Sequence, residues 1–399
     1  MRNITGTPVE GQDFFGRSEE AAQFLDLLHE NANILLTAPR RVGKTSFVLE
    51  ICRRWEEEGH KATLLDIEDC ADELAFAERL LSSLEQSGVG RGLLDTIAKG
   101  LRRIRKALGR VKLGAAGVNA DLGDDSQETV ASVIENLLAK VERGEQKLLI
   151  AIDELPEMLL HLAQAPDGQA RVSLFLHFLR RLRQSYRDKV RWIFLGSIGL
   201  DHFVEERGLA KTINDLTVET LGVFPREEAE AFLEKLAEGY GMHWVDDADS
   251  YLIEKLGWPL PHHLQLVFHT VRSAMRSTDQ AEIDRERVDQ AFEELLQPQR
   301  LGTFDTWRAR LDEELGAEDA ALAKRLLGIL CRDPKGADRD SLLQGVAQAY
   351  PHTDPGELKD RVREALHLLV RDGYLIPAEG RHAFRSFLLR EYWRRREGA

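Results

Sequence analysis

The stretch that decides the fold is "ILLTAPRRVGKTSFVLEICRRW", residues 34–55. It begins with an apolar run typical of a strand, continues into a loop that ends with Gly43, Lys44 and Thr45, and closes with an amphipathic run. A loop that leads from a strand into a helix directs free backbone N–H groups to one point, and the helix dipole adds partial positive charge there. The stretch therefore predicts a phosphate-binding loop at residues 38–46.

Each of the three residues that end this loop has an expected role. Gly43 lets the backbone approach the phosphates, Lys44 reaches the β- and γ-phosphates, and Thr45 offers its hydroxyl to Mg²⁺. Ala38 stands where such loops usually carry a glycine, and Pro39 biases it toward extended conformations that alanine adopts freely. We therefore expect the alanine to be tolerated. The other loop residues expected to contact the nucleotide are Arg40, Arg41, Val42 and Ser46.

A second apolar strand, "KLLIAIDELPEML" at residues 147–159, ends in Asp153 and Glu154. Carboxylates at the carboxyl end of a parallel strand lie at the ligand-binding edge of the sheet. We expect the pair to face the phosphate loop from the adjoining strand, with Asp153 holding the metal through water and Glu154 polarising the attacking water. The alternative is two acids that begin a surface helix. A glutamate at this place favours hydrolysis, because binding alone needs no base.

The rest of the chain predicts three further parts. Apolar runs alternate with helical patterns up to about residue 223, which indicates a parallel sheet with crossover helices. Residues 224–298 carry apolar side chains at three-to-four spacing, typical of a small bundle of helices, and 299–316 are expected to be a linker. Residues 317–399 predict three helices and a β-hairpin with its turn at "AEG", which is the order of a winged helix.

With these motifs in order, the chain resembles the AAA+/STAND-like archaeal-type P-loop ATPases, relatives of the initiator ATPases. The resemblance rests on "FFGRSEE", "APRRVGKTS", "AIDE", "IFLGS", "GWPLP" and the terminal winged helix. It implies ATP or ADP with Mg²⁺ as ligands. By the same resemblance, Phe15, Gly16 and Arg17 lie near the adenine and ribose, and Ser197 is a polar sensor of the γ-phosphate or of the attacking water. The resemblance also implies that the helices of 224–298 form a lid, in which Pro259 marks the element over the nucleotide.

Arginines and histidines leave two roles open. Many AAA+ proteins place a second sensor arginine beside the lid motif, whereas this chain has His262 and His263, which could substitute or could be interface or capping residues. Arg180 and Arg183 share one face of a predicted helix with an apolar stripe. They are candidates for an arginine finger that reaches a neighbouring protomer; the alternative is that their stems cover the edge of the core.

The charge distribution limits the partners. The chain has 54 basic and 68 acidic residues, a net charge of −14, so nucleic-acid binding would have to rest on local patches. One is "KGLRRIRKALGRVK", residues 99–112, which could bind nucleic acid, anionic lipid or an acidic partner, or could neutralise acidic neighbours. The others are the winged helix and the tail at 394–396, for which DNA and a protein partner are both open.

Three distant cysteines and the lack of an apolar leader or membrane segment favour a cytoplasmic protein. The sequence as a whole predicts an ATP-binding and slowly ATP-hydrolysing switch that couples nucleotide state to the position of the winged helix. Three alternatives stay open: a DNA-binding initiator or transposition-regulator ATPase, a defence or signalling scaffold that forms nucleotide-dependent homo-oligomers, and a nucleotide-binding protein without turnover.

Overall fold

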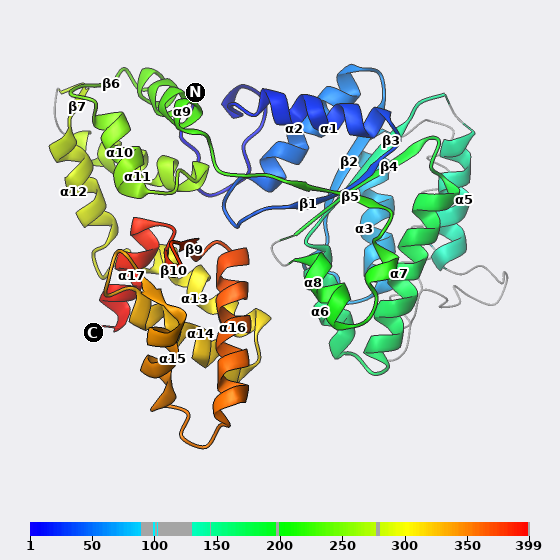
Figure 1. Cartoon of the computed structure of the whole chain (residues 1–399). Helices are drawn as coiled ribbons and strands as arrows, with labels where there is room; N and C mark the ends of the chain where they lie inside the picture. The colour runs from blue at the N-terminus through cyan, green and yellow to red at the C-terminus, as the bar shows by residue number, and fades with distance from the viewer. Residues whose placement is uncertain are drawn as a thin grey trace. The chain divides into compact units, whose positions relative to one another are not determined.

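The structure, a computed structural model, describes residues 1–88, 99, 102, 130–143, 145–196, 199–276 and 280–397. The chain folds into two compact units (Figure 1). One unit comprises residues 17–38 and 44–221; we call it the sheet unit. The other comprises residues 1–16, 39–43 and 222–399; we call it the helical unit. The predicted boundaries between lid, linker and winged helix stay a prediction.

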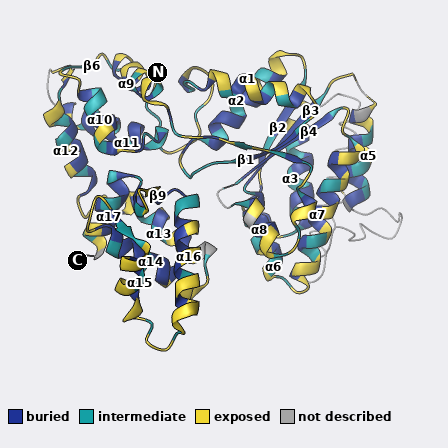
Figure 2. Ribbon diagram, in the orientation of Figure 1, coloured by how far each residue is buried: buried dark blue, intermediate teal, exposed yellow. Residues whose placement is uncertain are grey.

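The sheet unit is built on five parallel strands in the order β2-β3-β4-β1-β5. The strands are β1 (Asn33–Thr37), β2 (Lys61–Asp66), β3 (Leu148–Asp153), β4 (Val190–Leu195) and β5 (Leu216–Thr220). Both β3 and β4 are buried along their whole length (Figure 2), as their continuous apolar runs predict for strands covered on both faces. All five strands coincide with the apolar runs of the sequence.

Helices cover the two faces of this sheet (Figure 1). Helices α1 (Ser18–His29) and α2 (Lys44–Glu57) pack on one face. The other face carries α3 (Glu73–Gln86), α5 (Val130–Glu142), α6 (Leu155–Gln164) and α7 (Gly168–Ser185), and its core includes Ile150, Ile152, Trp192 and Phe194. The shorter elements are η1 (Gly11–Asp13), α8 (Leu200–Glu206) and η2 (Ala210–Thr212). Because the five strands of this sheet run in the same direction, the loops after β1 and β3 lie at one edge of the sheet.

The helical unit begins with α9 (Arg226–Glu238), α10 (Ala248–Leu256), α11 (Pro261–Met275) and α12 (Arg285–Leu295). Two short strands that the helical periodicity did not predict, β6 (His243–Trp244) and β7 (Glu282–Ile283), pair within this part. The segment expected to be a linker contains α13 (Gly302–Glu314), which buries Phe304, Trp307 and Leu311. Its apolar residues therefore belong to the core of this unit.

The last part of the chain has the element order of a winged helix. Helices α14 (Ala317–Leu330), α15 (Arg339–Ala347) and α16 (Pro355–Arg371) precede the hairpin β9 (Leu375–Ala378) and β10 (Arg381–Phe384), and α17 (Phe387–Glu397) follows the hairpin. The hairpin turn lies at Glu379 and Gly380, as predicted. A further strand, β8 (Ala337–Asp338), completes a sheet in the order β8-β10-β9. None of the helices in the described residues is long and apolar enough to cross a membrane.

Candidate nucleotide site

The loop between β1 and α2 has the backbone of a turn that closes on a helix. Within it, Arg41 (φ 65°) and Gly43 (φ 93°) adopt left-handed conformations, whereas Ala38 does not. Glycine is favoured only where φ is positive, so the alanine at position 38 causes no backbone strain. Gly43 meets this requirement as a glycine, and Arg41 does so at a cost of about 1–2 kcal/mol. Strain of this kind at a non-glycine residue is typical of ligand-binding loops.

Lys44 is the first residue of α2 and is only 8% exposed. Its Nζ donates a hydrogen bond to the carbonyl oxygen of Ala38, 3.1 Å away. A buried ammonium is unfavourable in an apolar environment and needs hydrogen-bond acceptors or a counter-charge. The lysine is therefore held across the mouth of the loop, where phosphate oxygens could serve as further acceptors.

Thr45 and Asp153, the two predicted metal residues, are in direct contact. The Thr45 hydroxyl donates to Asp153 Oδ2 over 2.7 Å. The expectation that β3 adjoins β1 is wrong, because β4 lies between them. The contact forms nevertheless, since α2 packs on β2 and β3 and so brings its first turn over the end of β3.

Burial dominates the chemistry of Asp153, which is 6% exposed. Loss of water raises the pKa of its carboxyl group to about 6; the neighbouring Glu154 carboxylate also raises it, while the Thr45 hydroxyl and the Lys44 ammonium lower it. Removing a carboxylate from water disfavours its charged form unless a cation compensates. A divalent cation at this place would supply that compensation.

Glu154 lies at the start of α6 in a left-handed conformation, with φ 57°. Its N–H donates to Asp153 Oδ1 over 3.0 Å. A Cβ added to Gly196 would lie 3.5 Å from Glu154 Oε2 and 2.6 Å from the Cδ of Pro156, so the glutamate carboxylate reaches the end of β4. The predicted sensor Ser197 follows shortly after β4 in the sequence but lies outside the described residues.

One acidic residue at this edge was missed by the sequence analysis. Asp66 ends β2 and is the register partner of Asp153 on β3. Its negative charge also raises the pKa of Asp153. The signal was present in "KATLLDIE", where an acid ends an apolar strand as it does in "LLIAID", but only the sheet register pairs the two residues.

The residues expected near the adenine differ in their surroundings. Phe15 packs against Phe224 and Phe232, with ring centroids 6.2 and 5.4 Å apart. Gly16 has φ +72°, and a Cβ there would lie 2.0 Å from a Glu228 carboxylate oxygen. Arg17 is buried, also in a left-handed conformation, and forms an ion pair with Glu20 at 3.4 Å. Their contact with a base stays a prediction.

Pro259 and the two histidines belong to the helical unit. The neighbouring Trp258 is buried against His263 and Trp307, with ring centroids 6.5 and 6.4 Å away. Burial lowers the pKa of His262 to about 4 and that of His263 to about 3, and the Arg41 guanidinium contributes to both shifts. Both imidazoles are therefore neutral at pH 7, which favours a packing role over that of a cationic sensor.

The two candidate arginine fingers make contacts within the sheet unit. Arg183 is 3% exposed; its guanidinium donates to both Asp215 carboxylate oxygens, at 2.8 and 3.0 Å, and to the Thr212 carbonyl. Arg180 donates to the Lys211 carbonyl oxygen over 2.5 Å. These contacts favour the alternative in which the stems cover the core edge. A role toward a second protomer stays a prediction.

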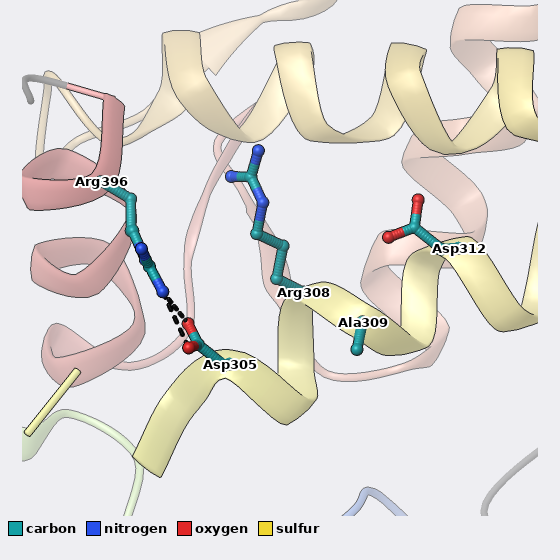
Figure 3. A pocket seen from close by; sticks show the side chains of 5 residues that line it. All are labelled: Asp305, Arg308, Ala309, Asp312 and Arg396. Atoms are coloured by element: carbon teal, nitrogen blue, oxygen red, sulfur yellow. Dashed lines mark hydrogen bonds and ion pairs between the residues drawn. The ribbon is translucent and has the colours of Figure 1, made fainter. Parts of the chain in front are cut away.

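The basic patches are partly neutralised by the chain itself. In the tail, Arg394 pairs with Glu391, Arg395 with Glu293, and Arg396 with Asp305. Figure 3 shows the last pair at the wall of a pocket of about 430 Å³ lined also by Arg308, Ala309 and Asp312. On α16, Arg361 pairs with Asp319 and Arg363 with Asp360. Apart from Lys99 and Arg102, the patch at 99–112 lies outside the described residues.

Solved structures resemble the whole chain. A Walker-type ATPase of Pyrococcus abyssi superimposes with a TM-score of 0.65 at 14% identity, covering 99% of this chain and 100% of that one. The ORC2 protein of Aeropyrum pernix, solved in ADPNP–ADP complexes, superimposes with a TM-score of 0.61 at 12% identity, covering 100% and 98%. The sequence matches no protein-family model and no curated protein. At these identities the likeness shows the fold, and the predicted P-loop NTPase fold is confirmed.

Proposed function

We propose that the chain binds ATP at the loop of residues 38–46 and hydrolyses it, as a member of the AAA+/STAND-like archaeal-type ATPases. The observation that carries the proposal is the hydrogen bond between the Thr45 hydroxyl and the buried Asp153 carboxylate, close to the ammonium of Lys44. A magnesium triphosphate requires a lysine and a hydroxyl at the amino end of a helix and a carboxylate at the end of a nearby strand. That the similar Pyrococcus abyssi protein is a Walker-type ATPase supports the same function here.

Mg²⁺ fits the residues present, because Thr45 and Asp153 offer oxygen ligands and the buried carboxylate would gain from a cation. When bound, the ion would neutralise charge on the phosphates. Lys44 would hold the β- and γ-phosphates, and Gly43 would direct backbone N–H groups to them. Glu154 would take a proton from the attacking water, with Ser197 orienting the γ-phosphate.

The remaining predicted residues have supporting roles in the proposal. Phe15, Gly16 and Arg17 would hold the base and ribose, and Pro259 the lid element. Loss of the γ-phosphate would change which conformation of the helical unit is favoured, since a ligand shifts an equilibrium only through contacts that differ between its states. We favour a protein partner for the winged helix over DNA, because Arg361 and the tail arginines are already paired with acids. A cytoplasmic location remains an expectation.

The test separates binding from hydrolysis. We expect Lys44→Ala to abolish ATP binding measured by calorimetry. Glu154→Gln should bind ATP within a few fold of the unmodified chain but release phosphate at least about 10²-fold more slowly, the size of a general-base contribution. Glu157→Gln, which alters the acid in the first turn of α6, is the matched control and should leave both measurements unchanged. Phosphate release that is insensitive to Glu154→Gln would contradict the proposed hydrolysis.

A further inference from the structure

Two histidines and a glutamate come together at the edge of the sheet unit opposite the phosphate loop. His29 is the last residue of α1, just before β1, and Glu58 and His60 follow α2, just before β2. One ligand atom from each of the three side chains lies within 4.8 Å of the others. The His29 Nε2 and a Glu58 carboxylate oxygen are already 2.8 Å apart. The strands are parallel, so this cluster precedes their amino ends while Lys44 follows a carboxyl end.

The backbone fixes the spacing of Glu58 and His60. Gly59 has φ +88°, its N–H donates to the Glu56 carbonyl, and the His60 N–H donates to the Trp55 carbonyl. This is the Schellman pattern that ends a helix on a left-handed glycine. The Gly59 carbonyl also accepts a hydrogen bond from Gln146 over 3.0 Å. The two ligand candidates therefore project from a turn that is held in place.

An aromatic ring orients the two imidazoles. Trp55 is fully buried, and its ring centroid lies 5.0 Å from that of His29 and 4.7 Å from that of His60. The His29 and Glu58 side chains are 40% and 39% exposed, so solvent reaches the cluster. The arrangement thus combines a rigid base with an open side.

We propose that His29, Glu58 and His60 bind a divalent cation of the zinc class, with water completing the coordination. Two imidazoles and one carboxylate with an open position form a known zinc ligand set, and imidazole selects Zn²⁺, Co²⁺, Ni²⁺ or Cu²⁺ over Mg²⁺. The carbonyl ends of α1 and α2 add partial negative charge at the same place. Bound metal would tie the end of α1 to the end of α2, the helix that begins at the phosphate loop.

Nearby charges set limits on this site. Burial and the Lys147 and Lys189 ammoniums lower the pKa of His60, while Glu58 raises it. The same two ammoniums also repel a cation. The site should therefore bind more weakly than a structural zinc site enclosed by thiolates.

The experiment is a Co²⁺ titration of the full chain, without nucleotide or Mg²⁺, followed by the visible absorption of the bound ion. We expect one Co²⁺ per chain, displaced by Zn²⁺ and not by Mg²⁺. His29→Ala and His60→Ala should each weaken binding at least about 10-fold, a loss that even partners outside the ligand shell can cause. His177→Ala, which removes an exposed histidine of α7, is the matched control and should bind normally.

A second variant guards against misfolding, because the alanine substitutions remove contacts with Trp55. Glu58→Gln keeps the shape of the side chain and removes its charge. With circular dichroism in EDTA showing a folded chain, excess Zn²⁺ should raise the Tm of the unmodified protein and of His177→Ala but not that of Glu58→Gln. The proposal is overturned if the unmodified chain takes up neither metal, or if the three ligand variants bind as tightly as the control.

Discussion

Asp153 combines a buried position with a charge that is costly to keep there. Its carboxyl pKa is raised from 3.8 to about 6, chiefly by burial, with the Glu154 carboxylate adding to the rise. A raised folded-state pKa means that the folded chain favours the protonated acid more than the unfolded chain does. The stability that this preference contributes is complete below about pH 4 and is lost as the pH rises through about 6.

We therefore expect Asp153→Asn to stabilise the chain without metal or nucleotide. The gain in free energy of unfolding should be about 1–3 kcal/mol at pH 7.5 and should shrink toward zero near pH 4. Urea unfolding in EDTA across this pH range measures it. Asp66→Asn, at the matching position of β2, is the control and should change stability much less because Asp66 is exposed. A gain that does not vary with pH would contradict the assigned cause.

The residues of the phosphate loop and the acidic strand end could be predicted from the sequence because their signals are local. Gly43, Lys44 and Thr45 follow an apolar strand closely, and Asp153 ends another. The partner of Arg183 could not be predicted in the same way. The spacing along the helix indicated only that Arg183 lies on the same helix face as Arg180 and the apolar stripe. The ion pair with Asp215 depends on a loop 32 residues later in the chain.

At the scale of elements, strand positions were predictable and strand order was not. Apolar runs mark β1 to β5, and they are most continuous in β3 and β4, which are buried along their whole length. The place of β4 between β1 and β3 depends on how the crossover helices pack, and no short stretch of sequence encodes it. The same holds for β8, whose two residues show no periodicity and pair with β10 only in the folded winged helix.

One glycine of the winged helix is required by both backbone and space. Gly336 has φ +68°, and a Cβ there would lie 1.8 Å from the carbonyl oxygen of His382 on β10. Gly380, in the hairpin turn, also has a positive φ of +77°, but an added Cβ there would meet no atom of the described residues within 4 Å. An alanine at Gly380 would therefore introduce backbone strain alone, whereas an alanine at Gly336 would add a clash with the backbone of β10.

We expect Gly380→Ala to cost about 1–2 kcal/mol of folding free energy, the usual cost of a left-handed alanine. Gly336→Ala should cost more, because β10 must also move away from β8. Hydrogen–deuterium exchange measures both: faster exchange should spread over β9 and β10 in Gly336→Ala and should be small in Gly380→Ala. Equal effects of the two substitutions would show that the contact with His382 carries no weight.

At the scale of the whole molecule, charge decides how the chain meets a polyanion. The net charge of −14 repels DNA. A protein gains free energy from binding DNA phosphates when its lysine and arginine side chains release the counterions condensed on the DNA. The tail arginines would have to break their ion pairs with Glu391, Glu293 and Asp305 before they could bind DNA phosphates. An exposed ion pair such as that of Arg396 with Asp305 is worth about 0–1 kcal/mol, whereas Glu391 is buried and its carboxylate would lose a partner if Arg394 moved away. The competition is therefore modest for the exposed pair and larger for the set.

We therefore expect duplex DNA to bind weakly at about 0.15 M salt, the physiological ionic strength, whether ADP or a non-hydrolysable ATP analogue is present. Fluorescence anisotropy with a labelled duplex over a range of salt concentrations measures this. Replacing the arginines at 394–396 with alanine should change DNA affinity no more than the control, in which Arg53, Arg226 and Lys235 become alanine with the same change in charge. Tight binding whose salt dependence is reduced only in the tail variant would instead favour the DNA-loading alternative. Each phosphate contact that is removed lowers the slope of log affinity against log salt concentration by about one.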